Sequence, residues 1–346
     1  MPEEQARTTI RAEGGGLKTL DPPGFDFAHA SVEPLRPDPR YSLSSRALGR
    51  MERLAKALFI IHQHEPDFDP AVLSRANPET ARSIILNVFA SSEIEGEGIS
   101  AEYVEAFVAA VTEPGEQVSG ELKQRMDSHD DIIATYFWGL NLETQPVISY
   151  DFVLEAHRRM FHRARSEIAG QIKDREVRIK WVRPDKQIVH VPTVEPERAE
   201  TFLRALCERA NAQFRAAERF ADASTLLAAG EFACDFLAIH PFRDGNGRMA
   251  RFLSSYLLER GGYHFSSVYP LDRVVLDSRG AYYEALNASQ RHWHTKDEDL
   301  SSWIEYFVGV VFGQWERAFS IVRDRAAKKG STSPKSFANR DRSPGA

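Results

Sequence analysis

Residues 240–251 read His-Pro-Phe-Arg-Asp-Gly-Asn-Gly-Arg-Met-Ala-Arg, and this stretch decides how the chain is expected to fold around its chemistry. The imidazole of His240 can accept a proton near neutral pH. The carboxylate of Asp244 is a hard oxygen ligand suited to Mg²⁺. The glycines on either side of Asn246 allow positive φ angles, so backbone N–H groups can turn toward an anion. These are the residue types needed to hold a nucleoside triphosphate.

Helical periodicity on both sides of this stretch predicts a helix–loop–helix. Residues 222–239 have small and apolar side chains at helical spacing, and glycines then interrupt the pattern. The second apolar stripe consists of Met249, Phe252, Leu253, Tyr256 and Leu257. The loop would lie at a helix N-terminus, where the helix dipole favours phosphate, with Arg248 and Arg251 in the first turn. The alternative is a helix junction with glycine caps and solvated arginines, which His240 and Asp244 disfavour.

The whole stretch resembles the signature of the Fic family, His-x-Phe-x-(Asp/Glu)-Gly-Asn-Gly-Arg-x-x-Arg, and matches every fixed position. Most members of that family are protein adenylyltransferases, which move AMP from ATP to a Ser, Thr or Tyr hydroxyl. The resemblance implies that His240 is the general base and that Asp244 holds Mg²⁺. It assigns nucleotide binding to Asp244, Gly245, Asn246, Gly247, Arg248 and Arg251. A kinase-type branch has Lys at the second glycine, so Gly247 favours nucleotidyl transfer over phosphoryl transfer.

A second motif lies upstream, at the end of a helix expected to begin at Asn77 and Pro78. Its inward stripe starts apolar and ends with Ser91 and Glu95, before glycines stop the helix. A buried Glu95 would need a cationic partner; the alternative is a solvated side chain at a helix end.

Residues 91–96, Ser-Ser-Glu-Ile-Glu-Gly, resemble the Fic inhibitory motif (Ser/Thr)-x-x-x-Glu-(Gly/Asn). The resemblance implies that Glu95 pairs with Arg251, misplaces the γ-phosphate and restrains the enzyme in cis. Glu93 and Glu97 are neighbouring carboxylates, but only Glu95 has a serine four residues before it and a glycine after it.

A β-hairpin is predicted at residues 175–192. Apolar side chains alternate with Arg178 and Lys180, Pro184-Asp185 offers a turn, and residues 188–191 form a second run. By resemblance this is the Fic flap, which binds a target segment by β-augmentation so that its hydroxyl faces the histidine. Nucleotide contacts are also assigned there to Val177, Arg178, Ile179 and Lys180. A purely structural hairpin is the alternative, and Thr193 departs from the usual Pro-Pro exit.

Downstream, Tyr282 and Tyr283 with Leu286 resemble the Tyr-Tyr-x-x-Leu segment that lines the adenine pocket in relatives. The family often has an adenine-contacting Asn where this chain has Gln290. Ordinary packing of the two tyrosines is the alternative to nucleotide contact.

The fold class predicted is mainly α: a Fic-type helical bundle core with a small β-hairpin flap and an N-terminal helical region. The expected divisions are an irregular N-terminal arm at 1–40, a helical region with the inhibitory motif at 41–120, the Fic core at 121–285, C-terminal helices at 286–322 and a disordered tail at 323–346.

Composition narrows the class of partner. The chain has 346 residues, 44 basic and 50 acidic, so its net charge of −6 gives no general drive toward nucleic acid. No apolar run approaches a membrane span and the N-terminus has no signal-peptide pattern. Cys207 and Cys234 lie in helical patterns and are expected as reduced thiols, so the protein is expected in the cytoplasm. The expected partners are ATP and a protein target docked on the flap, without nucleic acid or membrane; a homo-oligomer is compatible with the sequence.

Three other functions were compared with adenylyl transfer. His129-Asp130 with His157 suggests a metal phosphohydrolase, but the remaining ligands lack convincing spacing. A Fic-fold interaction protein that binds nucleotide without transfer would be expected to lack a motif residue, and none is missing. A Fic enzyme that uses another phosphate-bearing donor is the third. The sequence does not identify the target protein, the side chain modified, the releasing signal or any removal of AMP.

Overall fold

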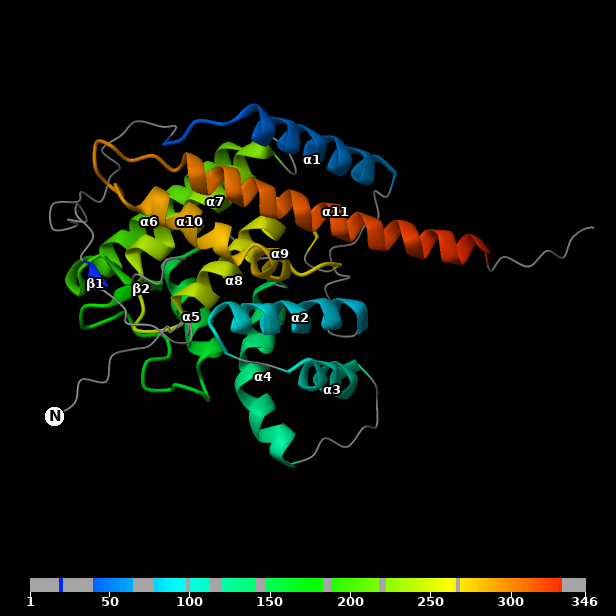
Figure 1. Cartoon of the computed structure of the whole chain (residues 1–346), viewed down its shortest axis with the longest axis horizontal. Helices are drawn as coiled ribbons and strands as arrows, with labels where there is room; N and C mark the ends of the chain where they lie inside the picture. Colours follow the sequence, from blue (N-terminus) through cyan, green and yellow to red (C-terminus); the bar gives the residue numbers. More distant parts are fainter. Residues whose placement is uncertain are drawn as a thin grey trace, which may run out of the picture.

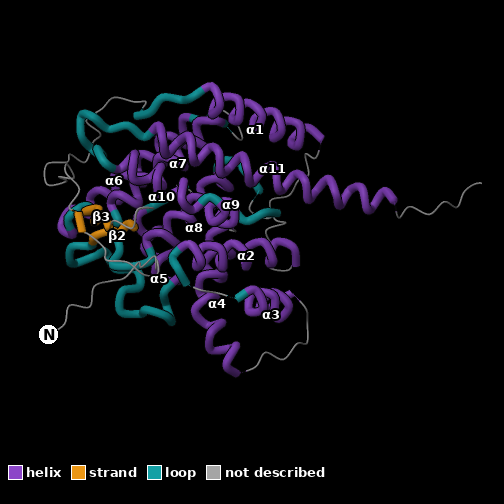
Figure 2. Tube along the Cα trace, viewed as in Figure 1, coloured by secondary structure: helices purple, strands orange, loops and turns teal. Residues whose placement is uncertain are grey.

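The computed structural model describes residues 19–20, 40–64, 78–97, 100–112, 120–140, 147–182, 188–217, 222–265 and 268–331. Most of the predicted N-terminal arm and part of the predicted tail lie outside these ranges, as do Asn77 and the hairpin turn at 183–187. Helices dominate the described chain (Figure 2), which confirms the mainly α fold class.

The helices follow one another along the chain with the hairpin between the fifth and sixth. They are α1 (Ser45–His64), α2 (Pro78–Ile94), α3 (Ala101–Thr112), α4 (Gly120–Leu140), α5 (Tyr150–Met160), α6 (Pro196–Ala216), α7 (Ala223–Ile239), α8 (Asn246–Arg260), α9 (Leu271–Asp277), α10 (Arg279–Gln290) and α11 (Ser301–Ser331). The strands are β1 (Thr19–Leu20), β2 (Arg178–Val182) and β3 (Ile188–Pro192).

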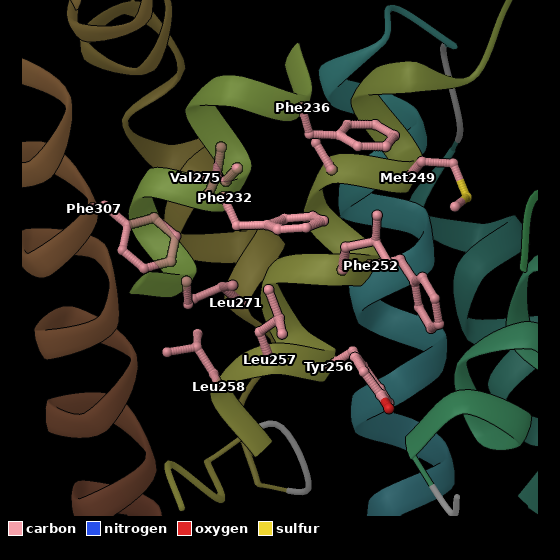
Figure 3. Close-up of a cluster of buried hydrophobic side chains, with 14 of the residues drawn as sticks. Phe232, Phe236, Met249, Phe252, Tyr256, Leu257, Leu258, Leu271, Val275 and Phe307 are labelled. Carbon is pink, nitrogen blue, oxygen red and sulfur yellow. The ribbon is translucent and has the colours of Figure 1, made fainter. Parts of the chain in front are cut away.

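The core is built around α7, which is buried along almost its whole length. A helix that is apolar on every side belongs inside a larger protein, and α7 packs against α6, α8, α10 and α11. Figure 3 shows its Phe232 and Phe236 beside Phe252 of α8, with side chains of α9 and α11 completing the cluster. The two ends of the 240–251 stretch, which follows α7 and opens α8, are therefore fixed by the most deeply packed helices.

The N-terminal helical region covers this core from two directions. In Figure 1, α1 runs along α11, whereas α2 lies on the opposite side with α3 and α4 beneath it. The inward stripe of α2 is confirmed, since Ile84, Val88 and Ser91 are all buried. Within the described residues no helix combines the length and apolarity needed to cross a membrane.

The predicted hairpin is confirmed as β2 and β3, which pair antiparallel from Arg178 opposite Pro192 to Val182 opposite Ile188. One prediction about the arm was wrong. Thr19 and Leu20 are not irregular but form β1, which pairs parallel with β3. A strand of two residues is too short to show a periodic pattern in the sequence. It forms because the edge of β3 offers unpaired backbone N–H and C=O groups.

Arg40, at the boundary of the predicted arm, is another feature absent from the sequence patterns. Its guanidinium is fully buried and contacts Asp235 of α7 (2.6 Å) and Glu298 (2.5 Å). Glu231 of α7 adds a third carboxylate at 4.0 Å, and these ion pairs fasten the chain before α1 to the central helix.

The end of α11 corrects the predicted C-terminal boundary. The helices were expected to stop at residue 322, but α11 continues to Ser331. The extension contains Ala, Arg and Lys, which favour helix without requiring an apolar stripe. The end of the apolar pattern near residue 322 therefore did not coincide with the end of the helix.

Candidate active site

His240 follows the last residue of α7 in a left-handed conformation, with φ 52° and ψ 59°. Its backbone N–H donates to Phe236 (2.8 Å), and its ring Nδ1 lies 3.3 Å from the carbonyl oxygen of Leu237. Burial, together with the nearby charge of Lys173, lowers the pKa of His240 to about 3. The imidazole is therefore neutral near pH 7 and has a lone pair available to accept a proton.

The loop after His240 is closed by Asn246. This buried amide accepts from the N–H of Phe242 (3.0 Å) and donates to the carbonyl oxygen of the same residue (2.8 Å). Gly245 has a φ of 78°, and a Cβ there would lie 2.2 Å from the ring of Phe161. The glycine is thus required for both its conformation and its packing, and the side chain of Asn246 shapes the loop.

Phe242 is anchored in the core by a buried histidine. Its ring stacks on His157 with centroids 3.7 Å apart and planes within 9°. Nδ1 of His157 accepts from the N–H of Gly170 (2.9 Å), and Nε2 lies 3.1 Å from the carbonyl oxygen of Asp244. His157, which the phosphohydrolase alternative used as a metal ligand, therefore has both ring nitrogens engaged in holding the loop.

Asp244 presents the carboxylate expected to bind Mg²⁺. One oxygen accepts from the N–H of Gly245 (2.6 Å), and the other lies 3.1 Å from Nη1 of Arg165. The side chain is 21% exposed, so it is open to a ligand. A single carboxylate suits Mg²⁺ when substrate phosphates and water complete the coordination.

Arg251 is held by the end of α2. Its Nη2 lies 2.7 Å from Oε1 of Glu95 and 3.1 Å from the carbonyl oxygen of Ser91, and its Nε donates to Oγ of Ser91 (2.9 Å). Asp272 of α9 adds a fourth contact at 3.4 Å. Burial by itself lowers the pKa of Arg251, but Glu95 and Asp272 outweigh it and raise that pKa.

Glu95 also lies directly over the glycine loop. A Cβ added to Gly247 would come within 2.2 Å of Oε1 of Glu95. The absence of a side chain at Gly247 therefore lets a carboxylate approach the backbone at the start of α8, where an anion is favoured.

Arg248, the other motif arginine, has a partner that the sequence did not assign. Its Nη1 lies 3.1 Å from Oε1 of Glu97, and its guanidinium lies 5.1 Å from the centre of the Phe161 ring. Glu97 was considered only as a competitor for the position of Glu95. Glu97 lies two residues after Glu95, and Arg248 lies three residues before Arg251. Once Glu95 is paired with Arg251, this spacing is the signal that could have identified the second pair.

A single cavity gathers most of the predicted nucleotide-binding residues. Glu95, the loop at 240–247, the start of β2 and α10 all contribute to it. Its lining includes Glu95, Val177, Arg178, Ile179, His240, Gly245, Asn246, Gly247, Arg251, Tyr282, Tyr283, Asn287 and Gln290. The side chain of Lys180 lies outside the described part of the chain. Arg248 and Asp244 are not among the lining residues and lie toward Glu97 and Arg165 instead.

Of the residues predicted to contact adenine, Tyr282 and Gln290 are buried and Tyr283 is partly buried. Tyr282 is buried against Trp303 and Tyr306. Gln290 donates to the carbonyl oxygen of Cys234 (3.1 Å). Asn287, one helical turn before Gln290, is partly exposed and lines the same cavity.

These features define a class: a helical protein with a neutral histidine and an anion-binding loop at a helix N-terminus, beside a β-hairpin. Residues 147–258, from just before α5 to near the end of α8, match the model of the Fic/DOC family. Residues 147–258 of this chain therefore form a Fic domain.

Relatives and solved structures agree with this. The protein adenylyltransferase fic-1 of Caenorhabditis elegans is 26% identical over 241 residues, 68% of this chain and 42% of that protein. The chain spans less than half the length of the curated relatives it matches. A Fic family protein from Desulfovibrio desulfuricans G20 has a TM-score of 0.58 at 17% identity, covering 86% of this chain and 79% of that one. Fic-1 from C. elegans has a TM-score of 0.55 at 20% identity, covering 80% and 73%. The two structures show a shared fold.

Proposed function

We propose that this protein is an adenylyltransferase that moves AMP from ATP to a Ser, Thr or Tyr hydroxyl of a target protein and is restrained in cis by Glu95. The observation that carries the proposal is that all motif residues are present while Glu95 pairs with the motif arginine Arg251 and lies against Gly247. The fic-1 relatives are named as protein adenylyltransferases, which supports the same reaction.

The proposed reaction uses the neutral imidazole of His240 as a base. The target hydroxyl loses its proton to His240 as its oxygen bonds to the α-phosphorus of ATP. The bond from the α-phosphorus to the bridging oxygen breaks, and pyrophosphate leaves. Backbone N–H groups of the loop and the guanidinium of Arg248 stabilise the charge that develops on the leaving group. Asp244 would hold Mg²⁺, which supplies positive charge to the phosphate oxygens when bound.

The hairpin is proposed to bind the target. The start of β2 lies beside His240, since residues 177–179 line the same cavity as that histidine. A target segment added to an exposed strand edge would be fixed by backbone hydrogen bonds whatever its sequence. This accounts for how a small flap could orient a hydroxyl toward His240.

The proposed restraint acts through Arg251. While Glu95 and Ser91 hold its guanidinium, that group cannot also bind the γ-phosphate in the productive position. A charge-assisted hydrogen bond is worth about 1.5–3 kcal/mol, which is enough to reduce the competent population about ten- to a hundredfold.

The test uses Mg²⁺ with ATP labelled at either the α- or the γ-phosphate. We expect α-label on protein from the wild type, about ten- to a hundredfold more from Glu95→Gly, and none from His240→Ala. Glu93→Gly is the matched control, because Glu93 is exposed in the same helical turn, and it should leave the rate near that of the wild type.

Each other outcome has a distinct meaning. Label only from the γ-phosphate would make the protein a kinase. An unchanged rate in Glu95→Gly with nucleotide still bound would exclude the restraint. No label from either position, with ATP bound, would favour a nucleotide-binding interaction protein or a different phosphate-bearing donor.

The proposed place of action is the cytoplasm. Cys207 and Cys234 are both free and buried, as expected of thiols in a reducing compartment.

A further inference from the structure

Lys173 is a buried cation between α5 and the flap, with only 2% of its surface exposed. Its ammonium donates to the carbonyl oxygen of Ile239 (2.9 Å), the residue before His240. It also donates to Oγ1 of Thr193 (2.8 Å), directly after β3. The Thr193 hydroxyl in turn donates to the carbonyl oxygen of Val177 (2.6 Å), directly before β2. One cation therefore joins the catalytic loop to both ends of the hairpin.

The backbone around Lys173 reinforces this link. Its N–H donates to the carbonyl oxygen of Pro241 (2.8 Å), and Ile172 forms a β-bridge with Phe242. Lys173 thus bonds to the residue before His240 through its side chain and to the residue after it through its backbone. A non-glycine residue in the left-handed region persists only where its surroundings enforce it, and these two bonds bracket His240.

A lysine is a costly way to fill this space if packing were the only purpose. Burying an ammonium is unfavourable unless it is well paired, and burial lowers the pKa of Lys173 to about 7. The titratable groups that face it are His240, which is neutral near pH 7, and the carboxylate of Glu195. An apolar side chain would avoid this cost but could not bind Ile239 and Thr193 together.

We propose that Lys173 is a positioning residue, which sets the distance between His240 and the flap and so aligns a flap-bound hydroxyl with its base. This rests on the proposed adenylyl transfer. Without the ammonium, the loop and the flap are each held by their own backbone bonds but are no longer fixed to one another through this side chain. A misplacement of about 1 Å can cost about a hundredfold in rate.

The kinetic test compares Lys173→Met, Lys173→Arg and Thr193→Val in the Glu95→Gly background. We expect Lys173→Met to lower kcat about ten- to a hundredfold with ATP affinity unchanged within about twofold, and Lys173→Arg to recover part of the loss. Thr193→Val leaves the bond to Ile239 intact, so it should raise KM for the target more than it lowers kcat. Unchanged kcat and KM in a folded Lys173→Met protein would overturn the proposal.

A second readout does not depend on activity. Amide hydrogen exchange should accelerate in residues 177–182 and 240–247 together in Lys173→Met, but only in residues 177–182 in Thr193→Val. Unchanged exchange in both segments, or faster exchange throughout the protein, would overturn the positioning role. If the parent transfers no AMP but the exchange pattern is as expected, the link between loop and flap holds and the proposed function fails.

Discussion

Asp244 pairs with a cation of the protein itself, because Nη1 of Arg165 lies 3.1 Å from its Oδ2. Arg165 is about half-exposed, at 51%, and exposed ion pairs of this kind are worth about 0–1 kcal/mol. The pair is therefore weak enough to be displaced if Asp244 binds Mg²⁺ as proposed, and Arg165 would then compete with the ion.

At this site we expect Arg165→Ala to lower the Mg²⁺ concentration that gives half-maximal transfer by up to about fivefold. The measurement is a Mg²⁺ titration of AMP transfer in the Glu95→Gly background. Arg163→Ala is the matched control, since Arg163 pairs with Asp131 instead, and its titration should follow the parent. A Mg²⁺ requirement that rises in Arg165→Ala would contradict competition and would make Arg165 part of the binding site.

At the scale of elements, the end of α2 contacts both motif arginines of α8. Glu95 reaches Arg251, and Glu97, just past the helix, reaches Arg248. The two pairs differ in exposure, because the side chain of Glu97 is 43% exposed and that of Glu95 is 15% exposed. The second pair should therefore be the weaker one.

We expect Glu97→Gln to raise the transfer rate by about one and a half- to fivefold, consistent with about 0.2–1 kcal/mol for an exposed pair. Glu95 and Glu97 belong to the same short segment, so releasing one from α8 should also loosen the other. The increase in Glu95→Gly/Glu97→Gln should therefore be smaller than the product of the increases in the two single variants. Rates of α-label incorporation for the three variants measure this. A Glu97→Gln rate below that of the wild type would mean that Glu97 supports the active state.

The elements also show what could be predicted from the sequence. Helices α2, α7 and α8 and the hairpin were predictable because their periodic patterns reflect burial on one face or throughout. The motif residues were predictable because they all lie within one short stretch of sequence, residues 240–251. Lys173 was not predicted, since it belongs to no motif and its partners Ile239 and Thr193 are known only from the fold. Glu97 was passed over because only Glu95 matched the upstream motif. Gln290 fell at the expected position, yet its amide is bonded to Cys234, a packing contact that no spacing reveals.

For the whole molecule, buried titratable groups link folding to pH. Burial lowers the pKa of His157 to about 4 and of His240 to about 3, whereas an unfolded histidine titrates near 6.5. Between these values the unfolded chain binds protons that the folded protein does not, so stability falls as pH falls. Asp272 acts in the opposite direction, because burial raises its pKa to about 6 and the folded protein takes up that proton first.

With two histidines opposing one carboxyl group, the unfolded state binds about one more proton near pH 5. The free energy of unfolding should then decrease by roughly 1.4 kcal/mol per pH unit on acidification in that region. Urea unfolding at several pH values from 7 to 4.5 measures the slope. His157→Gln should remove most of it, because one histidine then balances Asp272, whereas His292→Asn, at an exposed position, should leave it unchanged. A slope in His157→Gln equal to that of the wild type would show that the acid sensitivity arises from groups other than the histidine that stacks on the catalytic loop.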